Sequence, residues 1–218
     1  MIYKAIIQPP AWNRREIARY ARADATDERI AALIEECINE AEAILEYRVC
    51  YTTDAIIRSG SDLCFCDICT ASATVAKAVS GCEHILLFAA TIGAEFDRLT
   101  AKYSRLEPSK ALILQAVGAE RIESLCDMFC DLISTQLNAS EKSLRPRVSP
   151  GYGDIPLNMQ QPLFKVLDCE RKIGLTLNES LLMSPTKSVT ALAGIGAYQC
   201  RNTDKCAACD KSDCLYRK

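Results

Sequence analysis

The sequence predicts one α+β domain in which two long helices accompany several short strands. Two segments, residues 24–50 and 109–137, carry apolar side chains at helical spacing. Between them, residues 84–91 (HILLFAAT) form a continuous apolar run bounded by Gly81 and Gly93. A run this short favours a buried strand over a helix.

Local signals support both helix starts. Asp24 or Thr26 can cap the first helix, and Asp27 and Glu28 place negative charge on its first turn, where the helix dipole favours it. Pro108 suits the start of the second helix. The other expected elements are helices over residues 71–79 and 95–103 and strands over residues 3–7, 48–52 and 188–195.

The composition is that of a globular protein. Hydrophobic residues make up 49% of the 218 and charged residues 25%, which excludes wholesale disorder. A chain of this length buries about 70% of its unfolded surface, enough for a core without disulfides. The net charge is -2, so no basic surplus favours nucleic acid as a partner. No run of about 18 uncharged apolar residues indicates a membrane span.

Cysteine content is the unusual feature of the chain. There are 13 cysteines, an odd number, and the first residues contain no apolar run that could serve as a signal peptide. We therefore expect a cytoplasmic protein whose cysteines are buried, metal-bound or redox-active rather than paired in disulfides.

Four cysteines lie close together in a charged C-terminal tail, which we assign to residues 199–218, after a domain over residues 1–198. Their spacing is C-x5-C-x2-C-x4-C, which suits zinc or an iron–sulfur cluster without separating the two. The alternative is a reduced tail without metal. The candidate metal ligands are Cys200, Cys206, Cys209 and Cys214.

A second group, Cys64, Cys66 and Cys69, reads C-x-C-x2-C before an expected helix. These residues could complete a metal site with another cysteine. Because no fourth ligand lies nearby, the favoured interpretation is three small buried residues at a helix start.

Several catalytic classes are not supported. His84 is the only histidine, and neither a G-x-S-x-G nor a P-loop motif is present, so hydrolase chemistry is not expected. Glu120, Glu123 and Asp127 share one side of the second long helix. A solvated face is the expected interpretation, although a carboxylate lining a cleft could hold an ammonium or ribose group.

The most specific string is R-V-S-P-G-Y-G-D-I-P, residues 147–156. Glycines beside prolines fix an extended backbone whose N–H and C=O groups are expected to be available to a ligand. Arg147 offers a planar fork to a carboxylate, and Tyr152 offers an amphipathic ring. The alternative is a proline-rich surface loop.

Residues 147–152 resemble the R-P-A-P-G-Y motif of the activation (reactivation) domain of cobalamin-dependent methionine synthase. Residues 80–93 resemble that domain's strand and glycine turn, and residues 177–189 resemble its L-T-E-S-F-A-M-W-P-G-A-S-V segment. The resemblance covers about residues 70–195. It implies a mixed or antiparallel twisted sheet flanked by two long helices.

The resemblance implies a function. In the family, this domain presents S-adenosylmethionine to a corrinoid whose cobalt has slipped to Co(II), and an electron from a flavodoxin- or ferredoxin-like donor helps to restore methylcobalamin. Arg147, with the adjoining backbone, would hold S-adenosylmethionine, and Gly151 and Tyr152 would lie toward the corrin ring. The residues carried over are Arg147, Val148, Ser149, Pro150, Gly151 and Tyr152.

The chain also departs from the family pattern. After Tyr152 the family has P-A-C-P-E-H-T-E-K, whereas this chain has G-D-I-P-L-N-M-Q-Q, so roles of those family residues do not transfer. The family's C-terminal aromatic pair has only Tyr198 as a nearby counterpart. Because no cobalamin domain is attached, we expect a free-standing protein that meets a corrinoid-binding methionine synthase, or a similar corrinoid protein, in trans. The alternative function is an electron-transfer module that uses the C-terminal cysteines.

Overall fold

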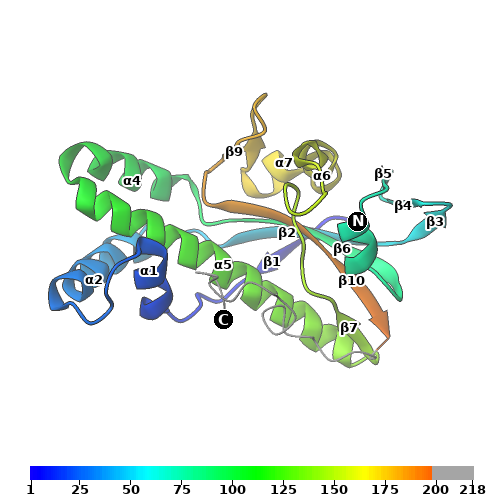
Figure 1. Cartoon of the computed structure of the whole chain (residues 1–218), viewed down its shortest axis with the longest axis horizontal. Coiled ribbons are helices and arrows are strands. Elements are labelled where there is room, and N and C mark those ends of the chain that lie inside the picture. Colours follow the sequence, from blue (N-terminus) through cyan, green and yellow to red (C-terminus); the bar gives the residue numbers. More distant parts are fainter. Residues whose placement is uncertain (198–218) are drawn as a thin grey trace.

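A curled five-stranded antiparallel sheet forms the centre of the molecule (Figure 1). The structure is a computed structural model and describes residues 1–197. The strand order is β1-β2-β6-β10-β7, and every neighbouring pair is antiparallel. These strands are β1 (Tyr3–Ile6), β2 (Arg48–Ala55), β6 (Cys82–Thr91), β7 (Lys142–Leu144) and β10 (Ser188–Ala197).

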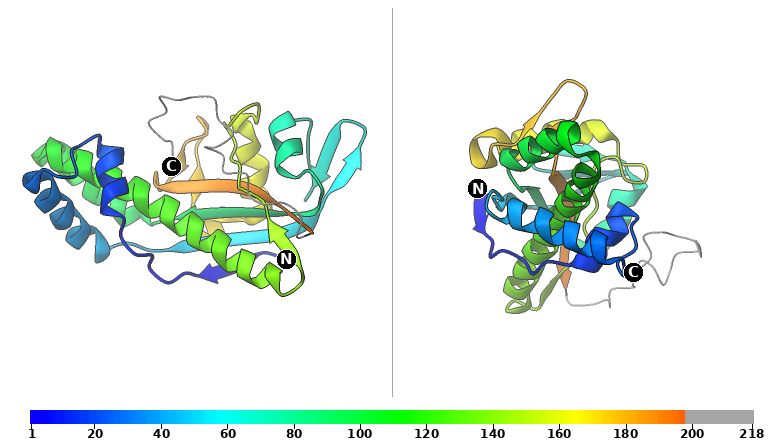
Figure 2. Two further views of the ribbon diagram at one scale, coloured as in Figure 1. Left: turned by 60° about the horizontal axis from the view of Figure 1, so that its bottom comes forward. Right: turned by 90° about the vertical axis from the view of Figure 1, so that its left-hand side faces the viewer.

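Helix α5 runs diagonally along one face of this sheet, and three further helices pack against α5 near one of its ends (Figure 2). These four helices are α1 (Arg14–Ala21), α2 (Glu28–Glu42), α4 (Ala94–Leu106) and α5 (Pro108–Asn138). Three shorter helices belong to the core on the other face. They are α3 (Ala73–Ala78), α6 (Gln160–Leu167), which a 3₁₀ turn over Leu157–Met159 precedes, and α7 (Cys169–Ile173).

Two small sheets lie outside the central one. One is the three-stranded sheet of β3 (Ile57–Ser59), β4 (Asp62–Phe65) and β5 (Ile68–Thr70). The other pairs β8 (Thr176–Leu177) with β9 (Met183–Ser184).

Strand β6 explains the continuous apolar run. Side chains alternate between the faces of a strand, and here both faces are covered. Leu86 and Phe88 belong to the core beneath α5, whereas Ile85 and Leu87 belong to the core beneath α6 and α7. A strand buried on both sides has no polar positions to alternate with, so the prediction of a buried strand over residues 84–91 is confirmed.

The predicted α+β class with helices on an antiparallel sheet is confirmed, and so is the helix over residues 109–137. The first long helix was predicted too long, because α2 ends at Glu42 and Arg48 already begins β2. Its cap is Asp27, whose carboxylate accepts the N–H groups of Arg29 and Ile30. The chain leaves the helix early because Glu46 donates its N–H to the carbonyl of Ile92 at the end of the sheet.

Arg121, which forms a buried ion pair with Glu120 within α5, connects this helix to the N-terminal segment. Arg121 is 0% exposed and Glu120 is 2% exposed. The Arg121 guanidinium donates to the carbonyls of Pro10 and Ala11 at 2.7 and 2.9 Å and lies 3.8 Å from the Trp12 ring centre. The expectation of a solvated Glu120 is therefore wrong, because this carboxylate neutralises a buried guanidinium.

Gly118 lets α4 approach α5. A Cβ at this position would lie 2.4 Å from Cε1 of the fully buried Phe96 and 2.9 Å from Cε of Lys187. Gly118→Ala is expected to lower the free energy of unfolding by about 1–3 kcal/mol, as overpacked cores do. Helix propensity alone predicts the opposite sign, a gain of about 1 kcal/mol. Urea unfolding of the parent and the variant therefore decides between overpacking and helix propensity. A stabilised variant would contradict the close packing.

Candidate functional site

The loop that carries the family-like motif begins as an irregular continuation of the sheet edge. After β7, the N–H of Arg145 donates to the carbonyl of Gly194 at 2.8 Å. Val148 then exchanges both backbone hydrogen bonds with Leu192 at 2.9 Å. The backbone of Val148 was expected to be available to a ligand. That expectation is wrong, because the buried strand β10 takes both groups.

The following residues form a compact turn. Gly151 and Gly153 have φ values of 85° and 60°, which glycine adopts without strain. The N–H of Gly151 donates to the carbonyl of Ile155, and the N–H of Tyr152 donates to the carbonyl of Ser149. Within residues 1–197, no hydrogen bond uses the N–H of Ser149 or the carbonyl of Pro150. Because Pro150 is buried and Ser149 is half-buried, the N–H of Ser149 is the main-chain group left for a ligand.

Asp154 fastens this turn to the start of α3. Its carboxylate accepts the hydroxyl of Ser72 at 2.6 Å and the N–H groups of Ala73 and Thr74 at 2.7 and 3.0 Å. Gly153 allows the contact, because a Cβ there would lie 2.4 Å from Oγ1 of Thr74. The hydrogen bonds from Ser72 and Thr74 hold the pKa of Asp154 well below its usual range. The family-like string gave no sign of this contact, since it falls where the chain departs from the family.

Asp154→Asn is expected to destabilise the protein at neutral pH, because an amide cannot serve as the same charged acceptor. The carboxylate binds its proton less tightly in the folded than in the unfolded chain. Its contribution is therefore present above the ordinary pKa of 3.8 and is lost as the pH falls toward the lower folded value. Denaturant unfolding of both proteins at neutral and acidic pH tests this. A stability difference that does not shrink in acid would contradict it.

Arg147 lies in a charge cluster with α5. Its guanidinium donates to Asp127 at 2.5 Å and to Glu123 at 2.7 Å, and its side chain is 22% exposed. The Arg147 guanidinium, which was expected to bind a ligand carboxylate, therefore already donates to two carboxylates of the chain itself. One positive and two negative groups leave the cluster with a net charge of about -1. Such a cluster favours a cationic ligand group over an anionic one.

Tyr20 borders this cluster, and Tyr152 lies further along the loop. Burial raises the pKa of Tyr20 on α1, and the negative charge of Glu123 raises it further, so the phenol remains protonated beside the cluster. Tyr152 at the tip of the loop is 62% exposed. The structure thus brings Arg147 together with Glu123 and Asp127, whereas the side chains of Val148 and Pro150 are buried. Arg147 thus joins the predicted loop to two of the three predicted acidic residues of α5, Glu123 and Asp127.

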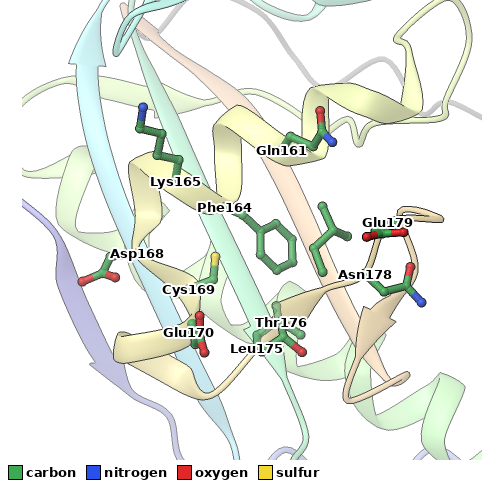
Figure 3. Close-up of a pocket in the computed structure, with 11 residues that line it drawn as sticks. Gln161, Phe164, Lys165, Asp168, Cys169, Glu170, Leu175, Thr176, Asn178 and Glu179 are labelled. Atoms are coloured by element: carbon green, nitrogen blue, oxygen red, sulfur yellow. The ribbon is translucent and has the colours of Figure 1, made fainter.

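A pocket of about 560 Å³ lies on the other face of the sheet, between α6, α7 and the segment that leads into β8 (Figure 3). The ring of Phe164 points into it, and the thiol of Cys169 lies beside that ring (Figure 3). Charged and amide side chains surround these two: Gln161, Lys165, Asp168, Glu170, Asn178 and Glu179. Neither Arg147 nor Tyr152 lines this pocket.

The cysteine predictions need correction. Cys64 and Cys69 form a disulfide across the hairpin of β4 and β5, and Cys66 is free. They were expected as unpaired residues at a helix start, but a two-residue turn places Cys64 directly opposite Cys69. Within residues 1–197 no group of three or more His, Cys, Asp or Glu side chains is arranged to hold a metal ion.

The predicted tail ligands Cys200, Cys206, Cys209 and Cys214, and Tyr198 with them, lie outside the described residues. A zinc or iron–sulfur site there stays a prediction. Among the described helices, none combines the length and apolar character needed to cross a membrane.

A family model described as "Vitamin B12 dependent methionine synthase, activation domain" matches residues 4–199. The chain belongs to this activation-domain family. The match extends the resemblance seen over residues 70–195 to most of the N-terminal segment and confirms it. No curated protein sequence matches the chain.

Among solved structures, the activation-domain chain is similar to one titled "Crystal Structure of the MetH Reactivation Domain bound to AdoHcy". The TM-score is 0.64 at 14% sequence identity, and the similarity covers 92% of this chain and 80% of that chain. At this identity the similarity shows a shared fold. It confirms the expected activation-domain architecture, with its curled antiparallel sheet and flanking helices.

Proposed function

We propose that this activation-domain protein binds S-adenosylmethionine and supports reductive methylation of a corrinoid protein in trans. The expected partner is a cobalamin-dependent methionine synthase or a related corrinoid protein, and the electron donor a flavodoxin or ferredoxin. The observation that carries the proposal is the loop over residues 147–154, which bears the family-like motif and whose Arg147 binds Glu123 and Asp127 on α5. The solved relative was crystallised with AdoHcy, which supports a ligand of this class.

The residues present fit such a ligand. S-adenosylmethionine supplies a sulfonium methyl group and carries an ammonium and a carboxylate. Glu123 and Asp127 would attract the two cationic groups, and Arg147 would bind the carboxylate through N–H groups that it now shares with them. The N–H of Ser149 would provide a main-chain partner for the same molecule.

The exposed tip of the loop is the proposed corrinoid-facing surface. Tyr152 is 62% exposed and Leu157 is 43% exposed. They flank Gly151, where a Cβ would lie 3.3 Å from Cδ1 of Leu157. Exposed apolar side chains on the loop that bears the motif suit contact with a flat, largely apolar macrocycle.

Isothermal titration of the full, anaerobically purified chain with S-adenosylmethionine tests the proposal, with metal content measured on the same sample. We expect one-site binding, and AdoHcy, which lacks the sulfonium charge, should bind about fivefold more weakly, corresponding to about 1 kcal/mol for one partly solvated charge. Absence of S-adenosylmethionine binding would contradict the proposal. If stoichiometric metal were present in that case, the electron-transfer function of the C-terminal cysteines would be favoured instead.

A further inference from the structure

The hairpin of β4 and β5 contains a disulfide that the proposed function does not use. Cys64 and Cys69 are paired residues of the two strands, and their thiols are joined. Cys66 and Asp67 form the turn between the strands with φ values of 45° and 60°, as a two-residue hairpin requires. Cys69 is exposed and Cys64 is half-buried, so the bond is open to solvent.

This disulfide is not needed to hold the hairpin to the protein. Leu63, Phe65 and Ile68 are only 2–5% exposed and belong to the hydrophobic core on the α6 face. The two cysteines are five positions apart, and closing so short a loop restricts the unfolded chain little. Seven other cysteines among residues 1–197 are free thiols. An exposed disulfide of this kind is typical of labile pairs rather than structural ones.

We propose that Cys64 and Cys69 form a reversible dithiol–disulfide couple that is reduced by an external dithiol, and that its state sets how firmly the loop over residues 147–154 is held. The consequence for ligand affinity rests on the proposed function. The couple itself and its effect on the loop do not.

Reduction of the couple is a two-step thiol–disulfide exchange with the external dithiol. A thiolate of the external dithiol attacks Sγ of the exposed Cys69, the Cys64–Cys69 bond breaks, and Cys64 leaves as a thiolate that takes a proton from water. The second thiol of the reductant then attacks the mixed disulfide and releases Cys69, which is also protonated. The hairpin disulfide gains two electrons and two protons, and the external dithiol becomes a disulfide.

Cys66 does not compete in this exchange. Its N–H donates to the Asp54 carboxylate at 2.5 Å, which fixes the turn. Burial, together with the neighbouring Asp54, raises the pKa of the Cys66 thiol to about 12. A thiol that remains protonated at neutral pH is a poor nucleophile, so the couple is confined to Cys64 and Cys69.

A short chain of contacts joins the couple to the loop. Cys69 precedes Thr70, whose hydroxyl accepts the N–H of Ser72 at 3.2 Å. Ser72 caps α3 and donates its hydroxyl to Asp154 at 2.6 Å. Asp154 lies two residues after Tyr152 at the loop tip. The disulfide at Cys69 therefore restrains strand β5, which leads directly to Ser72, the partner of Asp154. Reduction removes that restraint.

The couple is tested by equilibrating the full chain with graded ratios of reduced and oxidised dithiothreitol, alkylating free thiols and locating them by mass spectrometry. We expect Cys64 and Cys69 to become labelled together while circular dichroism stays native, and to pair again on reoxidation. Labelling only under denaturing conditions, or thiols that never pair, would overturn the proposal. Cys66→Ser should respond as the parent does, and a Cys66→Ser protein without the redox response would also overturn it.

The effect on the loop is tested in the same two states by hydrogen exchange at the N–H groups of Ala73 and Thr74. Reduction, or the double variant Cys64→Ser with Cys69→Ser, should speed this exchange and weaken S-adenosylmethionine binding by about fivefold or more. Unchanged exchange would overturn the coupling. Faster exchange in a protein that binds no S-adenosylmethionine in either state would uphold the coupling and contradict the proposed function.

Discussion

Arg121→Met is expected to lower the free energy of unfolding by about 3–5 kcal/mol, because removing one partner of a buried ion pair leaves the other charged and unneutralised. Both side chains are almost fully buried, with Arg121 0% and Glu120 2% exposed. The variant also leaves the carbonyls of Pro10 and Ala11 without their donor. Urea unfolding followed by circular dichroism measures the loss.

The double variant Glu120→Gln with Arg121→Met is the control for this prediction. It removes both charges, so it should be less destabilised than the single variant. The two proteins, together with Glu120→Gln alone, form a double-mutant cycle that isolates the coupling between the charges. An Arg121→Met protein that loses less than about 1 kcal/mol would show that Arg121 is not what holds the N-terminal segment to α5.

Arg147→Ala is expected to weaken S-adenosylmethionine binding by about 10- to 100-fold, which corresponds to the loss of a charge-assisted hydrogen bond. Without the guanidinium, the ligand carboxylate would face Glu123 and Asp127 alone, and repulsion would add to the lost contact. Arg147→Lys keeps the charge but not the planar fork, so an intermediate affinity is expected.

The matched control is Arg171→Ala, which removes the same charge at a side chain that is 85% exposed and 3.9 Å from its acidic partner. Its affinity should equal that of the parent. Isothermal titration of all three variants, each checked for native circular dichroism, gives the comparison. Arg147→Ala binding as tightly as the parent would remove Arg147 from the site.

Two elements with a strong local sequence pattern were predicted correctly. The buried strand at residues 84–91 and the helix at residues 109–137 were both expected within two residues of their observed ends. The end of α2 was missed, because the residues after Glu42 still read as helical and a hydrogen bond to Ile92, far away in sequence, ends the helix there. Helices α1, α6 and α7 were not expected, because short helices carry few periodic positions.

The candidate site was predicted only in part. The motif around Arg147 and Tyr152 was identified from the sequence, and the shared side of Glu123 and Asp127 was visible from their spacing. The sequence did not show that Arg147 would meet Glu123 and Asp127, because no local rule pairs residue 147 with a helix 20 positions earlier. The disulfide of Cys64 and Cys69 was missed for a related reason, since its pairing depends on the register of a hairpin.

The sequence by itself determined the fold class, the buried strand, the long helix and the loop motif, because each depends on the order and period of neighbouring residues. Only the tertiary structure decided how they meet. It placed Arg147 between two carboxylates, buried Glu120 with Arg121, and fastened Asp154 to the start of α3. Electrostatic and hydrogen-bonding partners act through space over a few ångströms, so their identity follows from packing rather than from distance along the chain.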